Sequence, residues 1–394
     1  MASRHVAIYL LYRVAGILQS PIVSSLAVAA LVGLVLIWIG YPCVVFALSR
    51  TRRPSVAAAP TRDPFVSVIL ATAGSASDIR ARIANLLMTS YDRNKVDIIV
   101  GLDAVNKQAS AEDLRDLPAN VRVVDGDPAG GKAATLNAAV RGSTAEILVF
   151  TDTAQSFRPD VIRHLVQSLA DPSVGAVSGM LETSVQGRRR TVADQYWRLE
   201  RRLRSAEARL HSAIGVTGAI YASRRDLWEP LPAGLILDDL YVPMRLVLRG
   251  KRIAYDDRAV ASDARSFAPR QEYQRKVRTL TGVIQLCAWL PRVLNPIRNP
   301  VWVQFVCHKL LRLLTPYLAA LVALGVAWRI GEALLHAQTR IPLIVAVSLV
   351  GLLLLLPPLR RRFATQVAWG IALQTSIVVA TVNGLRGRWD VWRR

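Results

Sequence analysis

Four acidic residues in the middle of this chain stand where carboxylates could do chemistry. Asp103 comes just past the apolar run VDIIV, and Asp152 comes just past EILVF. The adjacent pair Asp238 and Asp239 follows the apolar residues LIL. An open parallel sheet binds its ligand in the crevice outside the carboxyl ends of its strands. These positions therefore predict a site for a charged ligand, such as a diphosphate, at one edge of a sheet.

Asp103 and Asp152 have two interpretations each. A carboxylate beyond a strand can accept hydrogen bonds from the base or ribose of a nucleotide, but a lone Asp there is also a common turn former. Both interpretations stand for Asp103. Asp152 could bind a divalent cation that bridges a diphosphate, because Mg²⁺ takes one or two protein carboxylates and completes its shell with substrate oxygens and water. Asp152 could equally be a turn residue or a helix N-cap.

The Asp238-Asp239 pair suggests acid–base chemistry. Two buried neighbouring carboxylates raise each other's pKa, and one of them can then serve as a general base. The other interpretation is structural, and we expect Asp238 to cap the helix that follows in any case.

Basic residues form the second set of candidates. Gly130-Gly131-Lys132 resembles a turn that cradles phosphate at a helix N-terminus, although it is no Walker motif and could be a simple turn with a solvated Lys. Arg275 and Arg278 are three residues apart and share a helix face. Two guanidinium groups in that arrangement could clamp a diphosphate, or contact lipid phosphate beside a membrane.

Strands and helices alternate through the region that must position these side chains. The patterns predict strands at 65–71, 96–100, 121–124, 146–150, 174–178 and 252–255. They predict helices at 78–88, 133–141, 160–169, 191–211 and 239–248, and an amphipathic helix from residue 273. Such alternation with short connections predicts an α/β fold with a doubly wound, mostly parallel sheet.

Four apolar segments lie outside that region. No charged residue occurs in 14–49, 313–328, 341–359 or 363–385, and 52% of all residues are hydrophobic. Because about 20 apolar residues cross the hydrocarbon core of a bilayer, we expect one transmembrane span at 22–49 and three within 309–385. The chain is therefore expected in a lipid bilayer as a multi-pass protein.

The net charge of +22 is concentrated partly beside these spans. Arginine clusters follow the first span at 50–53 and the third at 360–362, and the positive-inside rule places both in the cytoplasm, at the cytoplasmic (inner) membrane. Three later spans would put the basic tail 386–394 outside, which conflicts with its four arginines. We expect no nucleic-acid partner, since multiple spans and acidic pairs do not fit an electrostatic groove.

The remaining segments complete the expected organisation. Residues 1–21 could form an interfacial helix, 50–64 a linker, 65–282 the catalytic domain and 283–308 interfacial helices. The three cysteines, Cys43, Cys287 and Cys307, have neither disulfide nor zinc-ligand spacing, which fits a reducing compartment.

The motifs taken in order resemble the family 2 membrane glycosyltransferases, the group that includes cellulose, hyaluronan and chitin-oligosaccharide synthases. The resemblance covers about residues 65–310. It rests on the pieces VSVIL, GLDA, GGKAATLNAAV, VFTDT, VGAVSG, YWRLE, VTGAIYASRRDL, LDDLYVPMRLVLRG and RKVRT.

That resemblance implies a GT-A fold and inverting transfer of a sugar from a nucleotide-sugar donor, taken here to be a UDP-sugar. Asp239 would be the base that deprotonates the acceptor hydroxyl, and Asp152 would hold Mg²⁺ or Mn²⁺. The donor would contact Asp152 and also Thr72, Asp103, Lys132, Arg275 and Arg278. The acceptor side would include Gly218, Trp197 and Asp238, with Tyr196 beside Trp197.

Two departures from the family pattern bear on function. The metal motif D-x-D reads Asp152-Thr153-Ala154 here, so the second carboxylate is missing. The Q-x-x-R-W motif of processive members reads RKVRT, without its aromatic residue.

Three functions remain open. The chain could extend an exported or capsular polysaccharide, with other export subunits as possible partners. It could add one sugar to a lipid acceptor, or it could be a non-catalytic membrane subunit of an export complex.

Overall fold

The structure is a computed structural model that describes residues 21–52, 62–183, 192–265, 268–335, 340–342, 344–345, 347–348 and 356–390. The chain divides into two compact units. One contains Met1–Cys43 with Cys307–Val379, and the other contains Val44–Val306 with Ala380–Arg394.

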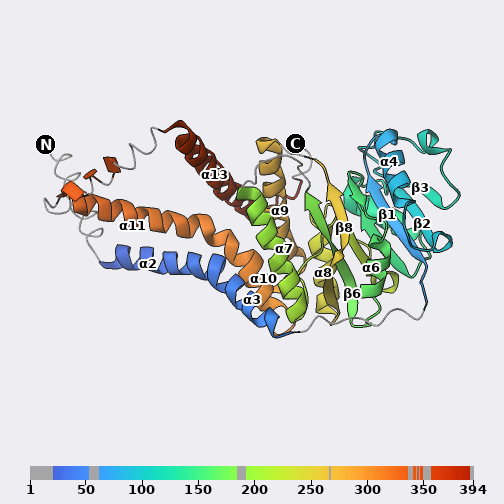
Figure 1. The fold of residues 1–394 in the computed structure, drawn as a ribbon, viewed down its shortest axis with the longest axis horizontal. Coiled ribbons are helices and arrows are strands. Elements are labelled where there is room, and N and C mark those ends of the chain that lie inside the picture. Colours follow the sequence, from blue (N-terminus) through green and yellow to red (C-terminus); the bar gives the residue numbers. More distant parts are fainter. Residues whose placement is uncertain are drawn as a thin grey trace. The chain divides into compact units, whose positions relative to one another are not determined.

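The larger unit is built on one eight-stranded sheet (Figure 1). Its order is β3-β2-β1-β4-β7-β6-β8-β5. Four neighbouring pairs run parallel (β1–β2, β1–β4, β2–β3 and β6–β8) and three run antiparallel (β4–β7, β6–β7 and β5–β8). The strands are β1 (Val66–Thr72), β2 (Val96–Leu102), β3 (Val121–Asp125), β4 (Ile147–Thr151), β5 (Gln155–Phe157), β6 (Val174–Thr183), β7 (Ile220–Arg224) and β8 (Arg252–Asp263).

Helices cover both faces of this sheet. In β1, Val66, Val68 and Leu70 join a hydrophobic core with residues of the helices α4 and α6. On the opposite face, a Cβ at Gly101 of β2 would lie 2.8 Å from Thr135 Cγ2, so the helix α5 packs directly on the backbone there. The principal helices of this unit are α4 (Ala76–Leu86), α5 (Gly131–Arg141), α6 (Val161–Ser168), α7 (Val192–Leu210), α8 (Asp238–Leu248) and α9 (Pro269–Trp289). The predicted doubly wound, mostly parallel α/β sheet is thereby confirmed.

Two strands of the sheet, β5 and β7, are not among those predicted from the sequence. The end of the apolar segment 214–222 forms β7, an antiparallel strand between β4 and β6. Its residue Tyr221 is fully buried and stacks on Phe150 of β4, with 4.4 Å between ring centroids. Antiparallel pairing requires no crossover helix, so the alternating pattern did not reveal this strand.

The apolar ends of the chain form long helices. The helices Ile22–Arg50, Trp302–Leu335 and Phe363–Leu385 are long and apolar enough to span a membrane. The first comprises most of α2 (Pro21–Val35), a π-helical turn and α3 (Tyr41–Arg50). The second contains α10 (Trp302–Phe305) and α11 (Thr315–Leu335), and the third lies in α13 (Pro357–Leu385). The interfacial helix predicted at 1–21 lies outside the described residues except for its last residue, and about half of the span predicted at 341–359 lies outside them.

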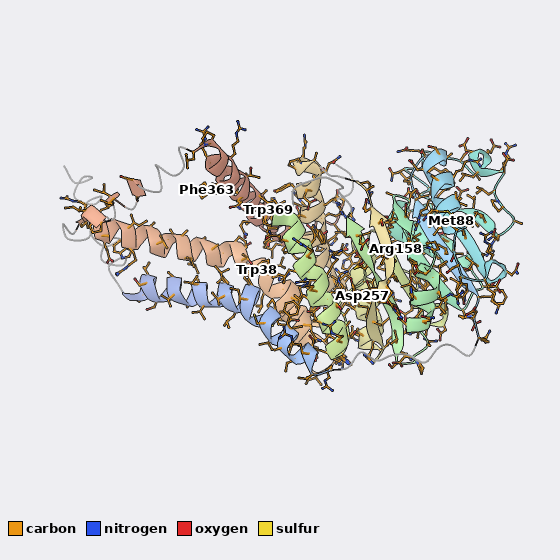
Figure 2. The ribbon with its side chains drawn as sticks, viewed as in Figure 1. Trp38, Met88, Arg158, Asp257, Phe363 and Trp369 are labelled. Carbon is orange, nitrogen blue, oxygen red and sulfur yellow. The ribbon has the colours of Figure 1, made fainter. Side chains whose placement is uncertain are left out.

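Within the smaller unit, α2 and α11 pack closely. A Cβ at Gly325 would lie 2.3 Å from Cβ of Ala27, so only a residue without a side chain allows this approach. Trp38, labelled in Figure 2, donates an Nε1–H bond of 3.1 Å to Thr315 Oγ1. Small residues and a polar contact therefore join two apolar helices.

Candidate active site

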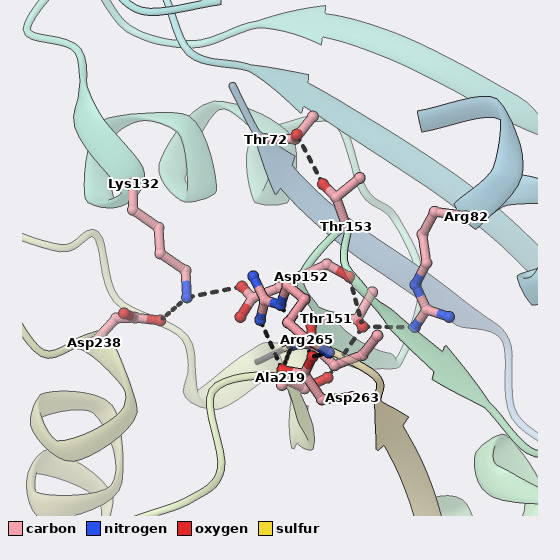
Figure 3. A network of polar contacts seen from close by, with 11 residues as sticks. Thr72, Arg82, Lys132, Thr151, Asp152, Thr153, Ala219, Asp238, Asp263 and Arg265 are labelled. Atoms are coloured by element: carbon pink, nitrogen blue, oxygen red, sulfur yellow. Dashed lines mark hydrogen bonds and ion pairs between the residues drawn. The ribbon is translucent and has the colours of Figure 1, made fainter. Parts of the chain in front are cut away.

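The carboxyl ends of β1, β2 and β4 bring the first predicted residues together. Thr72 ends β1, and its Oγ1 accepts hydrogen bonds from Gly74 N at 2.9 Å and from Thr153 Oγ1 at 2.7 Å. Asp152 follows β4 and stands beside Thr153 in the same turn (Figure 3). The parallel order of β1 and β4 places these two strand ends next to each other.

Lys132 joins two carboxylates from distant parts of the sequence. Its Nζ lies 3.1 Å from Asp152 Oδ1 and 3.4 Å from Asp238 Oδ2 (Figure 3). Burial lowers the pKa of Lys132, but the charges of Asp152, Asp238 and Asp239 outweigh burial and leave the pKa raised. The ammonium group is therefore a permanent cation between the carboxylates.

The turn before Lys132 requires glycine. Gly130 and Gly131 have φ of 66° and 80°, a region that residues with a Cβ rarely adopt. A Cβ on Gly130 would also lie 2.5 Å from Val105 Cγ2. The two glycines let the chain enter α5 so that Lys132 faces the ends of β4 and α8.

Asp239 lies in the first turn of α8, close to Gly218. Burial, followed by the charge of Asp238, raises the pKa of Asp239 to about 6, against opposing charges of Lys132, Arg204 and Arg278. A Cβ on Gly218 would come within 3.3 Å of Asp239 Cβ and 3.4 Å of its Oδ2. Gly218 therefore forms the wall against which the carboxylate rests.

The expectation that Asp238 caps the following helix is wrong. Helix α8 begins at Asp238, its N-cap residue is Leu237, and no side-chain cap bond forms there. The Asp238 carboxylate, which is 7% exposed, turns to Lys132 instead. An ion pair with a buried ammonium is stronger than a cap bond to a neutral N–H, which explains the orientation.

The two arginines of α9 have different surroundings. Burial lowers the pKa of Arg278, while the charges of Asp239 and Asp238 oppose that shift. Arg278 therefore lies within electrostatic range of the acidic pair. Arg275 lies one turn earlier on the same helix and acts on Arg278 as a like charge.

Asp103 has the geometry of a turn former. Its Oδ1 accepts backbone N–H bonds from Val105 and Asn106, and its Oδ2 accepts one of 2.7 Å from Gly131 N. These bonds tie the end of β2 to the start of α5. Asp103 thus positions the glycine turn, which favours the structural interpretation of this residue.

Trp197, the predicted acceptor-side residue, lies on α7. Its side chain is 43% exposed, and Lys276 Nζ of α9 lies 5.3 Å from its ring centroid and 5.0 Å from that of Tyr196. Arg204, seven residues along, shares its helix face because seven residues make two turns. Arg204 donates 2.8 Å to Thr217 Oγ1, next to Gly218.

Several residues of the site were missed by the sequence interpretation. Arg82 of α4 donates 2.6 Å to Thr151 Oγ1, and that hydroxyl bonds Ala219 O at 3.0 Å (Figure 3). The sequence interpretation also missed Arg204 of α7 and Arg265, which follows β8. The only sequence signal for Arg265 is its Asp-x-Arg spacing, and isolated arginines in a chain with 50 basic residues carry little information.

A divalent cation fits this site if the donor helps to hold it. Asp152 offers a carboxylate whose side chain is 38% exposed, and one protein carboxylate is enough when phosphate oxygens complete the shell. Among the described residues no three His, Cys, Asp or Glu side chains gather as a metal site. Any metal would therefore depend on Asp152 and on the substrate.

Acidic residues at the strand ends, a Lys–Asp network and a mixed, mostly parallel sheet define a GT-A-like α/β fold carrying long apolar helices. The profile of the family described as "Glycosyltransferase like family 2" matches residues 63–287. The chain belongs to this family.

Two known proteins are similar to this chain. The O-antigen chain rhamnosyltransferase RfbN of Salmonella typhimurium (strain LT2) is 26% identical over 159 residues, which are 38% of this chain and 50% of the relative. The chain thus spans about half the length of that curated relative. The structure of the mannosyltransferase PcManGT from Pyrobaculum calidifontis, in complex with GDP-Man and Mn²⁺, has 23% identity and a TM-score of 0.68, covering 92% of this chain and 99% of that one. The latter likeness supports the GT-A-like fold.

Proposed function

We propose that this glycosyltransferase moves a hexose, with inversion, from a UDP-sugar to a hydroxyl of a growing polysaccharide. The observation that carries the proposal is the raised pKa of Asp239 beside the Lys132 network. A base must be strong enough to take a proton and still be ionised at working pH, and a pKa near 6 meets both needs.

In the proposed reaction, Asp239 accepts the proton of the acceptor hydroxyl as its oxygen attacks the anomeric carbon. The bond from that carbon to the diphosphate oxygen breaks, and its electron pair leaves with the nucleoside diphosphate. Attack opposite the leaving group inverts the anomeric configuration. Gly218 supports this role, because a side chain at this position would crowd the Asp239 carboxylate.

Cations would stabilise the departing diphosphate. Lys132 stands ready between Asp152 and Asp238, and Arg278 lies within range of the same carboxylates, with Arg275 one turn away. Thr72 and the turn held by Asp103 stand where the nucleotide would lie. Mg²⁺ or Mn²⁺, held by Asp152 and the donor, would neutralise further diphosphate charge.

The acceptor and the location are part of the proposal. Trp197 and Asp238 would face the acceptor, and the apolar helices would hold the enzyme in the cytoplasmic membrane with the catalytic unit inside the cell. The missing aromatic residue after Arg278 favours a second candidate, the addition of one sugar to a lipid acceptor. Product length separates the two: a ladder on a gel indicates polymerisation, and one discrete lipid-linked spot indicates single addition.

Release of nucleoside diphosphate by the detergent-purified protein tests the proposed reaction. The screen uses UDP-glucose, UDP-GlcNAc, UDP-galactose, UDP-GalNAc, UDP-glucuronate and GDP-mannose, each with Mg²⁺, Mn²⁺ or EDTA and with membrane lipid extract as acceptor. Metal-dependent release from a UDP-sugar supports the proposal. Release only from GDP-mannose would reject the donor class, and no release at all would favour a non-catalytic export subunit.

A further inference from the structure

Strand β8 carries two copies of one side-chain arrangement. Arg258 donates from Nε to Asp256 Oδ1 at 2.9 Å and from Nη2 to Oδ2 at 2.7 Å. Seven residues later, Arg265 donates in the same way to Asp263, at 3.0 and 2.7 Å. In both cases the carboxylate is buried and the guanidinium reaches outward.

The two arrangements end in different places. Asp256 also accepts a 2.7 Å hydrogen bond from Ser168 of α6, a helix that packs on one face of the sheet. Asp263 accepts a 2.8 Å hydrogen bond from Gln155 Nε2 of β5, which pairs with it across the antiparallel ladder. Because β5 begins three residues after Asp152, the second arrangement is attached to the turn that carries the central carboxylate of the site.

Arg265 therefore lies within electrostatic range of Asp152. Figure 3 draws Arg265 and Asp152 in the same part of the site, with Lys132 reaching Asp152 from α5. The bonds with Asp263 chiefly raise the pKa of Arg265, and the charge of Asp152 raises it too, whereas Asp152 exerts no such effect on Arg258. The two arginines are alike in geometry and differ in their distance from the site.

A guanidinium fixed in this way suits phosphate. The pair with Asp263 holds the guanidinium through Nε and Nη2, and a guanidinium carries five N–H donors in a rigid plane. Its orientation is set before any ligand arrives, so little side-chain entropy is lost on binding. A cation held in advance also compensates for the carboxylate that Ala154 lacks in the metal motif, because it neutralises diphosphate charge directly.

We propose that Arg265 binds the diphosphate of the donor, held in place by Asp263 and Gln155. The inference rests on the proposed function, since it assigns a further contact to the same donor site. Asp263 and Gln155 act through Arg265 and are positioning residues.

Calorimetric titration of the full-length protein in detergent with UDP, UMP, GDP and GMP, each with Mn²⁺, tests the proposal. A charged hydrogen bond to the β-phosphate is present only with the diphosphates, so Arg265→Gln should weaken UDP or GDP binding about 10- to 100-fold and the monophosphates much less. Arg258→Gln, the matched control, should leave all four affinities unchanged. Arg265→Lys, which keeps the charge without the planar fork, should fall between.

The outcomes separate the two proposals. If the wild type binds a diphosphate and Arg265→Gln binds it equally well, or loses the same factor for the monophosphate, Arg265 is no diphosphate ligand and the proposed function stands. If the wild type binds none of the four nucleotides and releases none from any donor, the proposed function fails, and the role of Arg265 fails with it. If Arg265→Gln does not fold, two other variants test the inference. It would be overturned if Arg265→Lys bound diphosphate as tightly as the wild type and Asp263→Asn kept the wild-type preference for diphosphate over monophosphate.

Discussion

Lys132 Nζ lies 3.1 Å from Asp152 Oδ1, although the two residues belong to different elements and neither motif refers to the other. Strand β4 pairs in parallel with β1, and α5 packs against β1 and β2. The end of β4 and the start of α5 therefore lie close together. The ion pair and its extension to Asp238 give the site a fixed charge order before a donor binds.

Asp239→Asn should abolish sugar transfer and keep donor binding. The amide cannot accept the acceptor proton, and general-base catalysis contributes typically 10²- to 10⁴-fold, so we expect a loss of that order in kcat. The measurements are nucleoside diphosphate release and nucleotide affinity in the same preparation. Asp257→Asn, at an exposed position of β8 labelled in Figure 2, is the control. Turnover near the wild-type rate in Asp239→Asn would assign the base to another residue.

The pH dependence of transfer should show an acidic limb near pH 6. The base works only when it is ionised, and the pKa of Asp239 is raised to about 6 by burial and by Asp238. The rate should therefore fall about tenfold for each pH unit below that value and level off above it. The check is kcat/KM of the wild type between pH 4.5 and 8, and a limb centred near pH 4 would contradict the environment described for Asp239.

Arg204→Gln should move that limb to higher pH. The charge of Arg204 lowers the pKa of Asp239, so its removal makes the carboxylate hold its proton more tightly. The plateau rate at high pH should change much less than the rate at pH 6. Arg209→Gln, on the same helix and hydrogen-bonded to Ser205, should leave the profile unchanged. An acidic limb at the wild-type pH or at a lower pH in Arg204→Gln would show that the arginine does not lower the pKa of the base.

Gly218→Ala should lower kcat more than stability. The new Cβ would lie 3.3 Å from Asp239 Cβ and 3.4 Å from its Oδ2, so the carboxylate must move by a few tenths of an ångström. A small displacement of a reacting group can cost a large factor in rate, and we expect roughly a tenfold to hundredfold loss. Gly331→Ala, where nothing lies within 4 Å of the new Cβ, serves as control. Equal activity of both variants would remove Gly218 from the acceptor side.

Local patterns of the sequence were enough to predict six of the eight strands, the main helices and the candidate acids. Apolar runs predicted β1, β2, β3 and β4, because buried parallel strands are apolar on both faces, and helical spacing predicted α4 through α8. Charge-free segments indicated the apolar helices that precede and follow the sheet region in the sequence. The order of the motifs along the chain indicated the family, which the match over residues 63–287 confirms.

Only the tertiary structure decided which of these groups meet. In the structure, Asp238 pairs with Lys132 instead of capping its helix, and the Asp103 carboxylate accepts backbone hydrogen bonds. Strand β7 lies between β4 and β6. The fold also brings Arg204 toward Asp239 and Arg265 toward Asp152 from α7 and β8. The physical reason is that hydrophobic periodicity is a local property, whereas electrostatic partners are chosen by strand order and by helix packing over distances of a hundred residues.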